Sequence, residues 1–267
     1  MITSNPEKQK DIEALRASAA IGSLEDIGFL KLTFENADAV YCMIPPNFSE
    51  PNQVDYYQRI GENYANAIRA STIKRVVELS SYGAHLEKGT GFIVGSHKVE
   101  NMFNALPEVK VTHIRPGYFY YNLLHFVHMI KTAGFIASNF GSVDKLAMVS
   151  PKDIAAAIAA EFETTGRETK IRYVMSDDRT CNEVAAILGN AIGKPDLQWK
   201  TLTNEQMQTA LESRGMSAPT AATVVELGDA THKGLLREDY DLNKPIEIGK
   251  VKLEEFAKEF VVAFNQK

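Results

Sequence analysis

The sequence has no long apolar run and no long block of charge of one sign. Over its 267 residues no stretch reaches the ~18 consecutive apolar residues of a membrane helix. The 29 basic and 34 acidic side chains leave a formal net charge of -5, without the basic patch that duplex DNA requires. The composition therefore disfavours a membrane protein and direct binding to nucleic acid.

Residues that form disulfides or metal sites are also scarce. Cys42 and Cys181 are the two cysteines, and their wide separation lacks metal-type spacing, so we expect two reduced thiols. His125 and His128 stand three residues apart on an expected helix, but no third ligand of fixed spacing accompanies them, and we expect no metal site. The polar start of the chain, Met1–Lys10, has neither the basic nor the apolar region of a signal peptide. We therefore expect a cytoplasmic protein.

Glycine is present, but not in the pattern that binds dinucleotides. None of the 17 glycines forms G-x-G-x-x-G, the turn that brings backbone amides and a helix N-terminus to a pyrophosphate. Instead, Met1–Pro6 has the pattern of the end of a second strand and the start of a second helix. A strand, a turn and a helix, roughly 30 residues in such a unit, are not found. We expect poor pyrophosphate binding and an apolar sheet edge that invites aggregation or pairing with a second copy.

From Pro6 to about Tyr118, short apolar stretches alternate with helical patterns, as in a parallel sheet covered on both faces. The segment Asp38–Met43 is apolar and rich in strand formers, which predicts a strand buried on both faces. Ser23 can cap the helix that follows it. The other strands expected here are Lys74–Ser80 and Val109–Arg115, and the longer helices are Gln53–Ser71 and about Gly91–Leu106.

The remainder of the chain is mostly helical, with expected strands at Leu146–Val149, Ile171–Met175 and Leu197–Leu202. The sequence thus predicts an α/β fold: a Rossmann-like parallel sheet with helices on both faces and a small, mostly helical C-terminal lobe. We expect residues 1–150 to form a Rossmann-like core of the kind that binds NAD(P), incomplete at its N-terminus. Residues 151–267 supply the remaining core elements and a lobe that covers the substrate, within the same continuous domain.

Seven stretches form a series along the chain, and their order is more specific than any one of them. They are SNPEKQ (Ser4–Gln9), AAIGSLED (Ala19–Asp26), DAVYCMIPP (Asp38–Pro46), RVVELSSYGA (Arg75–Ala84), GFIVGSHKVENMF (Gly91–Phe103), THIRPGYFYYNLL (Thr112–Leu124) and LAMVSPKDIAAA (Leu146–Ala157). In this order they resemble the NmrA-like family of atypical short-chain dehydrogenases/reductases, and the likeness covers nearly the whole chain. The resemblance implies NADP or NAD as the cofactor.

The resemblance also implies where the adenine half of that cofactor would lie. Ser4 and Asn5 stand where the family commonly has a basic residue that pairs with the 2′-phosphate of NADP. Lys8, one turn along the helix, could reach that phosphate or could be an ordinary solvated lysine. Ser23 and Leu24 would flank the adenine.

For the rest of the cofactor, the resemblance implies that Ile44, Pro45 and Pro46 run beside the ribose and phosphates. Pro116, Gly117, Tyr118 and Phe119 match positions that line the nicotinamide. The list of candidates for the cofactor site is completed by Ser96.

The catalytic region departs from the family's patterns. No tyrosine precedes a lysine by four residues, so the Tyr-x-x-x-Lys pair of short-chain dehydrogenases is missing. Ser96 occupies the place, four residues before Glu100, where related reductases often have lysine or histidine. A phenol at Tyr118 could donate a proton, although an aromatic residue near a sheet end is more often a packing residue. The catalytic residue stays unassigned, with Tyr118 as the one weak candidate.

These features predict an NAD(P)H-dependent oxidoreductase that acts on a small carbonyl or quinone-type acceptor held under the C-terminal helices. One alternative is a non-catalytic NAD(P) redox sensor that contacts a regulatory protein. A further alternative is a truncated or mis-started product that does not bind dinucleotide. The expected partners are a small-molecule substrate and either a second copy of the chain or a regulatory protein.

Overall fold

The computed structural model describes residues 1–47, 49–164, 168–245 and 247–266. Its main sheet has four parallel strands in the order β3-β4-β5-β9. They are β3 (Ala39–Cys42), β4 (Arg75–Leu79), β5 (Lys110–Pro116) and β9 (Lys170–Val174). Each lies within one or two residues of a predicted strand, and the α/β class with a parallel sheet is confirmed.

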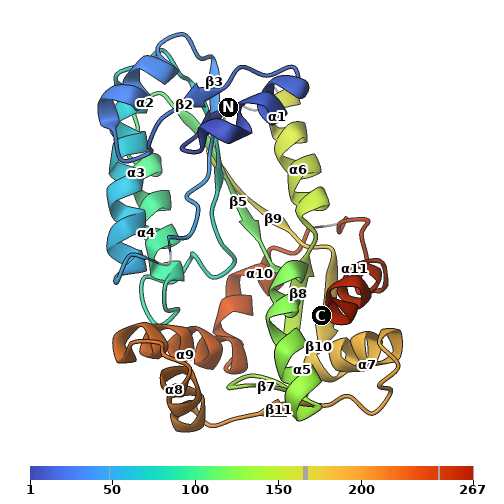
Figure 1. Cartoon of the computed structure of the whole chain (residues 1–267). Coiled ribbons are helices and arrows are strands. Elements are labelled where there is room, and N and C mark those ends of the chain that lie inside the picture. The colour runs from blue at the N-terminus through green and yellow to red at the C-terminus, as the bar shows by residue number, and fades with distance from the viewer. Residues whose placement is uncertain (48, 165–167, 246, 267) are drawn as a thin grey trace.

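Helices cover both faces of this sheet, as Figure 1 shows. The long α3 (Gln53–Arg69) and α4 (Ile93–Asn104) pack together on one face, while α6 (Pro151–Glu163) lies on the other. Glycine allows α3 and α4 to approach closely, because a Cβ atom on Gly61 would stand 2.9 Å from the Val99 side chain. Helix α6 begins at Ser150, whose hydroxyl accepts a hydrogen bond from the Lys152 amide.

The N-terminal segment forms a small sheet of its own. Strand β1 (Ile2–Thr3) pairs in parallel with β2 (Ala20–Ile21), and neither is hydrogen-bonded to the main sheet. Strand β3 is therefore an edge strand, with Tyr41 37% exposed, and the prediction that it is buried on both faces is wrong. The elements around these strands are η1 (Pro6–Lys8), α1 (Gln9–Ala14) and α2 (Ile27–Phe34).

The cap of helix α2 also differs from the prediction. Asp26, rather than Ser23, accepts the hydrogen bond from the Phe29 amide. The Ser23 hydroxyl accepts from the Glu25 amide in the turn just before the helix. The chain thus makes a turn of polar residues at the carboxyl end of β2 before the helix starts.

The C-terminal lobe lies beyond the carboxyl ends of the main strands, at the bottom of Figure 1. It contains a three-stranded sheet of order β10-β8-β6 and a parallel pair, β11-β7, in addition to the expected helices. Its elements are β6 (Tyr118–Phe119), η2 (Tyr120–Phe126), α5 (Val127–Ala133), β7 (Ile136–Ser138), β8 (Lys145–Val149), β10 (Asp177–Thr180), α7 (Cys181–Ala191), β11 (Trp199–Thr201), α8 (Asn204–Ser213), α9 (Ala218–His232), η3 (Leu235–Arg237), α10 (Glu238–Leu242) and α11 (Leu253–Asn265).

Two other expectations bear on the whole chain. Cys42 and Cys181 are both buried free thiols, as their spacing predicted. Among the helices of the described residues, none has the length and apolar character needed to span a bilayer.

Candidate functional site

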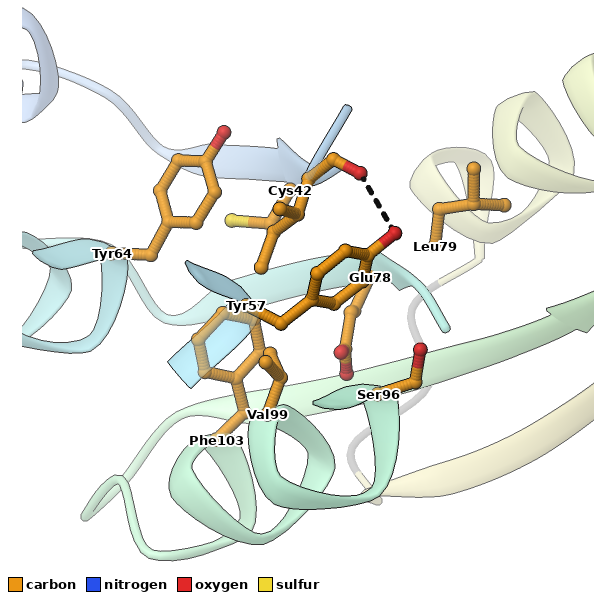
Figure 2. Close-up of a pocket in the computed structure, with 9 residues that line it drawn as sticks. Cys42, Tyr57, Tyr64, Glu78, Leu79, Ser96, Val99 and Phe103 are labelled. Carbon is orange, nitrogen blue, oxygen red and sulfur yellow. Dashed lines mark hydrogen bonds between the residues drawn. The ribbon is translucent and has the colours of Figure 1, made fainter. Parts of the chain in front are cut away.

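The candidate site lies where β3 and β4 end and α4 begins. A small gap of about 10 Å³, room for roughly one water molecule, opens there beneath the turn that follows β3. Parallel α/β sheets hold ligands at this carboxyl edge. The gap is shown in Figure 2 and is lined by Cys42, Ile44, Tyr57, Tyr64, Glu78, Leu79, Ser96, Val99 and Phe103.

Tyr57 is one of the aromatic residues that line this gap. It projects from α3 onto α4 at Gly95, where a Cβ atom would stand 2.7 Å from the tyrosine, so glycine is needed for this contact. The Tyr57 hydroxyl donates to the Ile44 carbonyl oxygen at 3.3 Å, the dashed bond in Figure 2. Burial raises the pKa of Tyr57 to about 12, so the phenol is neutral and holds its proton at physiological pH.

A buried acid–imidazole pair stands behind the gap. Glu78 of β4 bonds to Nδ1 of His113 on β5, and Nε2 of His113 lies 2.9 Å from the Asn104 amide oxygen. Burial raises the pKa of Glu78. Burial works against a charged His113, but the hydrogen bond and the charge of Glu78 outweigh it, so the pKa of His113 is raised. Glu78 thus favours the protonated form of His113, while burial favours the neutral form of Glu78, so the two groups titrate as a coupled pair.

A second buried network ties the sheet to the C-terminal lobe. Arg115 at the end of β5 makes two bonds to Glu100 of α4, at 2.9 and 2.6 Å. Its third nitrogen donates to Tyr173 at 3.1 Å and to Asp239 of α10 at 2.9 Å. The Ser80 hydroxyl donates to the same Glu100 carboxylate at 2.5 Å. One guanidinium thus joins α4, β9 and α10 just past the carboxyl ends of the strands.

The structure brings some of the predicted site residues together. Ile44 and Ser96 line the same gap, and the exposed Pro45 and Pro46 carry the chain out of the sheet above it. Phe119 packs beside Tyr121, with 5.1 Å between ring centroids.

Other predicted residues have their side chains elsewhere. The Tyr118 ring packs against the core of the lobe, 6.5 Å from the Phe140 ring, and burial raises its pKa. Pro116 is buried within β5, and Gly117 sits where a Cβ atom would stand 2.2 Å from the Ala147 carbonyl oxygen. Gly117 thus permits a close crossing of β5 and β8. This packing role is sufficient to explain why the residue is glycine.

The residues expected near the adenine follow the two strands of the small N-terminal sheet. Ser4 and Asn5 come after β1 and are exposed, and the Asn5 side chain caps the next turn by accepting from the Glu7 amide. Lys8 is exposed one turn on. Ser23 and Leu24 come after β2, with Leu24 packed against the core.

Sequence reasoning missed two aromatic residues of the site. Tyr57 belongs to an amphipathic stripe that predicts packing against the sheet, and its place at the gap depends on Gly95, 38 positions away by residue number. Tyr121 is 44% exposed and lies close enough for its charge to affect the pKa of Tyr57. The one signal in the sequence that could have indicated Tyr121 is its position shortly after the end of the strand that became β5.

A family model described as the NmrA-like family matches residues 3–256. The chain belongs to the NmrA-like family. Among curated proteins, it is 25% identical over 222 residues to an NAD(P)H azoreductase of Xenophilus azovorans, covering 82% of this chain and 74% of the relative. It is 26% identical over 194 residues to a (4-alkanoyl-5-oxo-2,5-dihydrofuran-3-yl)methyl phosphate reductase of Streptomyces griseus, covering 72% of this chain and 65% of that relative's length.

Solved structures share the fold at lower identity. An NADPH-dependent quinone oxidoreductase from Escherichia coli, in complex with NADPH, superposes with a TM-score of 0.82 and 22% identity, covering 97% of this chain and 88% of that one. The triphenylmethane reductase of a Citrobacter species, in complex with NADP(H), gives a TM-score of 0.79 and 20% identity, covering 97% and 89%. All four of these proteins are named as reductases or oxidoreductases, and three of the four descriptions include NAD(P)H, NADPH or NADP(H).

The described residues of this family member offer walls for a dinucleotide but do not fit its pyrophosphate. The G-x-G spacing of Gly89 and Gly91 precedes α4, yet the Gly91 amide donates to the Glu226 carboxylate at 3.1 Å. That loop packs against α9, since a Cβ atom on Gly91 would stand 2.3 Å from the Thr223 carbonyl oxygen. A gap of about 10 Å³ is also far below the several hundred Å³ of a typical small-molecule site.

Proposed function

We propose that the chain acts in the NAD(P)H-dependent reduction of a small carbonyl or quinone-type acceptor, with the pyrophosphate contacts supplied from outside residues 1–267. The observation that carries the proposal is the meeting of Ile44, Tyr57 and Ser96 at the carboxyl edge of β3 and β4, in an NmrA-like chain with an NAD(P)H azoreductase among its relatives. The names of the E. coli and Xenophilus proteins support a quinone or another flat, electron-poor acceptor.

The side chains of this region suit acceptor binding and proton supply. Phe119 and Tyr121 present two neighbouring aromatic rings, tilted by 59° to each other, and a flat acceptor can lie against either face. Tyr57 is protonated at physiological pH, with its pKa raised by burial to about 12, so it carries a proton that only a strongly basic oxygen, such as an alkoxide formed in the reaction, would take. We therefore place the proton donor of the proposed reaction at Tyr57, with Tyr118 as the untested candidate from the sequence.

The test is NADPH oxidation with p-benzoquinone, measured for residues 1–267 alone and for the same residues preceded by a designed glycine-rich strand–turn–helix. We expect turnover in the second protein. There Tyr57→Phe should lower kcat by about 100-fold, the order of magnitude that a general acid contributes. Tyr41→Phe, on the same sheet edge but not a lining residue of the gap, should leave kcat unchanged. Equal losses in the two variants would remove Tyr57 from the mechanism.

The second candidate function is a redox sensor that binds NAD(P) without turnover. The carboxylates around the gap already have protein partners: Glu78 is bonded to His113, and Glu100 to Arg115 and Ser80. Neither is therefore free to act as an acid or base, which favours binding without turnover. Cofactor binding by the extended protein without oxidation by any quinone or aldehyde would favour the sensor.

A further inference from the structure

A second and much larger cavity lies at the opposite edge of the main sheet from β3. It measures about 670 Å³, within the several hundred Å³ typical of small-molecule sites, and it shares no lining residue with the gap at Ile44 and Ser96. Figure 1 shows α6 beside β9, which together form two of its walls. Strand β9 is at the other end of the strand order from β3. It lies between α6, β9 and the chain that joins α10 to α11.

The inner wall of this edge cavity is apolar. Ala156 and Ala157 of α6 and Ile171 and Val174 of β9 face it. Because β9 is hydrogen-bonded only to β5 within the described sheet, its outer edge is uncovered, and Ile171 is 47% exposed. An aliphatic ligand chain would remove this surface from water, which is favourable.

A surplus of positive charge adjoins that wall. The buried Glu161 carboxylate is paired with three cations: Arg75 at 2.9 Å, Lys170 at 2.9 Å and Arg172 at 2.8 Å. One carboxylate leaves two of these three charges uncompensated within the cluster. The Nε atom of Arg75 is also buried without a hydrogen-bond partner among the described residues.

Of the three cations, Arg172 lines the cavity, so part of this positive charge is exposed to a ligand there. Its Nη1 atom donates to Glu161 and to the Ala157 carbonyl oxygen. Within the part of the chain that the structure describes, its Nε and Nη2 atoms make no hydrogen bond, and the side chain is 38% exposed. The guanidinium therefore keeps donors in the fork geometry that suits a carboxylate.

The acidic residues on the walls do not neutralise Arg172. Asp153 accepts from the Ser176 hydroxyl at 2.6 Å and from the Lys250 and Val251 amides. Asp239 is bonded to Arg115 and Tyr173. On the outer wall, Glu247 is offset by Lys250, which lines the same cavity.

We propose that the edge cavity binds an amphipathic carboxylate, with the headgroup on Arg172 and the aliphatic chain against Ala156, Ala157 and Ile171. The cluster of one carboxylate with three cations supplies the attraction for the anion, and the uncovered edge of β9 supplies the apolar contact. This site is independent of the proposed reductase function, because it shares no residue with the gap and needs no cofactor.

The test is isothermal titration of the full chain with decanoate, with decanol and inorganic phosphate as probes of the two halves of the ligand. We expect decanoate to bind at least tenfold more tightly than either probe, because only decanoate uses both the charge and the apolar wall. Decanol binding as tightly as decanoate would overturn the role of Arg172. Phosphate binding as tightly would overturn the role of the apolar wall, and no heat with decanoate would overturn the site.

Two matched pairs of variants locate the binding. Arg172→Gln and Lys170→Gln each remove one cation from Glu161, but only Arg172 lines the cavity, so we expect a tenfold or greater loss for Arg172→Gln alone. Ala156→Leu should block the cavity, while Ala155→Leu, next to it on the exposed face of α6, should not. Thermal melting verifies that each variant is folded. Equal effects within either pair would overturn the proposal.

Discussion

At the scale of single residues, Arg115 is a buried charge that depends on several partners. It is buried, it bonds to Glu100 twice, and it also reaches Tyr173 and Asp239. Burial disfavours its charge, but the bonds to Glu100 outweigh this and raise the pKa of Arg115. Removing it would leave the buried Glu100 carboxylate without its partner.

We expect Arg115→Gln to lower the free energy of unfolding by about 3–5 kcal/mol, the usual cost of breaking a buried ion pair. Urea denaturation measures this change. Arg59→Gln, which removes an exposed guanidinium from Glu25 and Glu50, is the matched control and should have a much smaller effect. Similar losses for the two variants would show that burial of the Arg115 network contributes little to stability.

The Glu78–His113 pair predicts how stability depends on pH. Both pKa values are raised in the folded protein, so the folded state holds more protons than the unfolded state. The contribution of His113 is fully present below its ordinary pKa of 6.5 and is lost as pH rises through the raised value. We expect the free energy of unfolding to fall as pH rises, from above the ordinary pKa of 4.5 for Glu78 and from above 6.5 for His113.

Glu78→Gln should flatten this decline, because it removes the carboxylate that raises the pKa of His113. Urea denaturation over a pH series measures the slope for both proteins. Glu259→Gln, an exposed substitution on α11, should keep the slope of the unaltered chain. A steep decline that survives in Glu78→Gln would mean that other groups cause it.

At the scale of elements, the crossing of β5 over β8 depends on one glycine. A Cβ atom on Gly117 would stand 2.2 Å from the Ala147 carbonyl oxygen and 2.4 Å from the Met175 sulfur. We expect Gly117→Ala to lower the free energy of unfolding by about 1–3 kcal/mol, as overpacking does. In Gly28→Ala, the nearest atom is a side-chain oxygen at 3.2 Å and the site is helical, so a smaller change than in Gly117→Ala is expected. Unaltered stability of Gly117→Ala would mean that the strands separate at little cost.

The sequence predicted the elements whose apolar pattern is strong. The strands of the main sheet and the helices α3 and α4 fall close to their predicted ranges because burial on one or both faces leaves a periodic pattern. Strand β10 was not predicted because its residues, Asp177–Thr180, are all polar and it forms by pairing with β8. The short α10 was not predicted because five residues are too few to show a helical period.

The candidate site was predictable only in part, for a related reason. Ile44 follows a recognisable strand, so its place at the sheet edge could be expected. Tyr57 reaches the gap by packing on Gly95, and Arg115 meets Asp239, which is 124 residues away in the chain. Contacts of this kind depend on how helices pack in three dimensions, which a single sequence pattern does not encode.

At the scale of the whole molecule, the chain has the fold of its family, but its described glycine loop before α4 is occupied by contacts to α9. The chain aligns over 97% of its length with the E. coli quinone oxidoreductase but covers 88% of that protein. None of its glycines forms the dinucleotide turn. The small sheet of β1 and β2 is not hydrogen-bonded to β3. We propose that the pyrophosphate contacts are what these residues lack, while Ile44 and Ser96 lie together at the sheet edge.

The most direct test of this account is isothermal titration with NADPH of residues 1–267 and of the same residues preceded by a designed glycine-rich strand–turn–helix. Each charge-assisted bond to a phosphate contributes about 1.5–3 kcal/mol, so two such bonds change the affinity by about 100-fold or more. We therefore expect a Kd above about 100 µM for residues 1–267 and binding at least 100-fold tighter for the extended protein. Micromolar binding by residues 1–267, or no gain in the extended protein, would contradict the account.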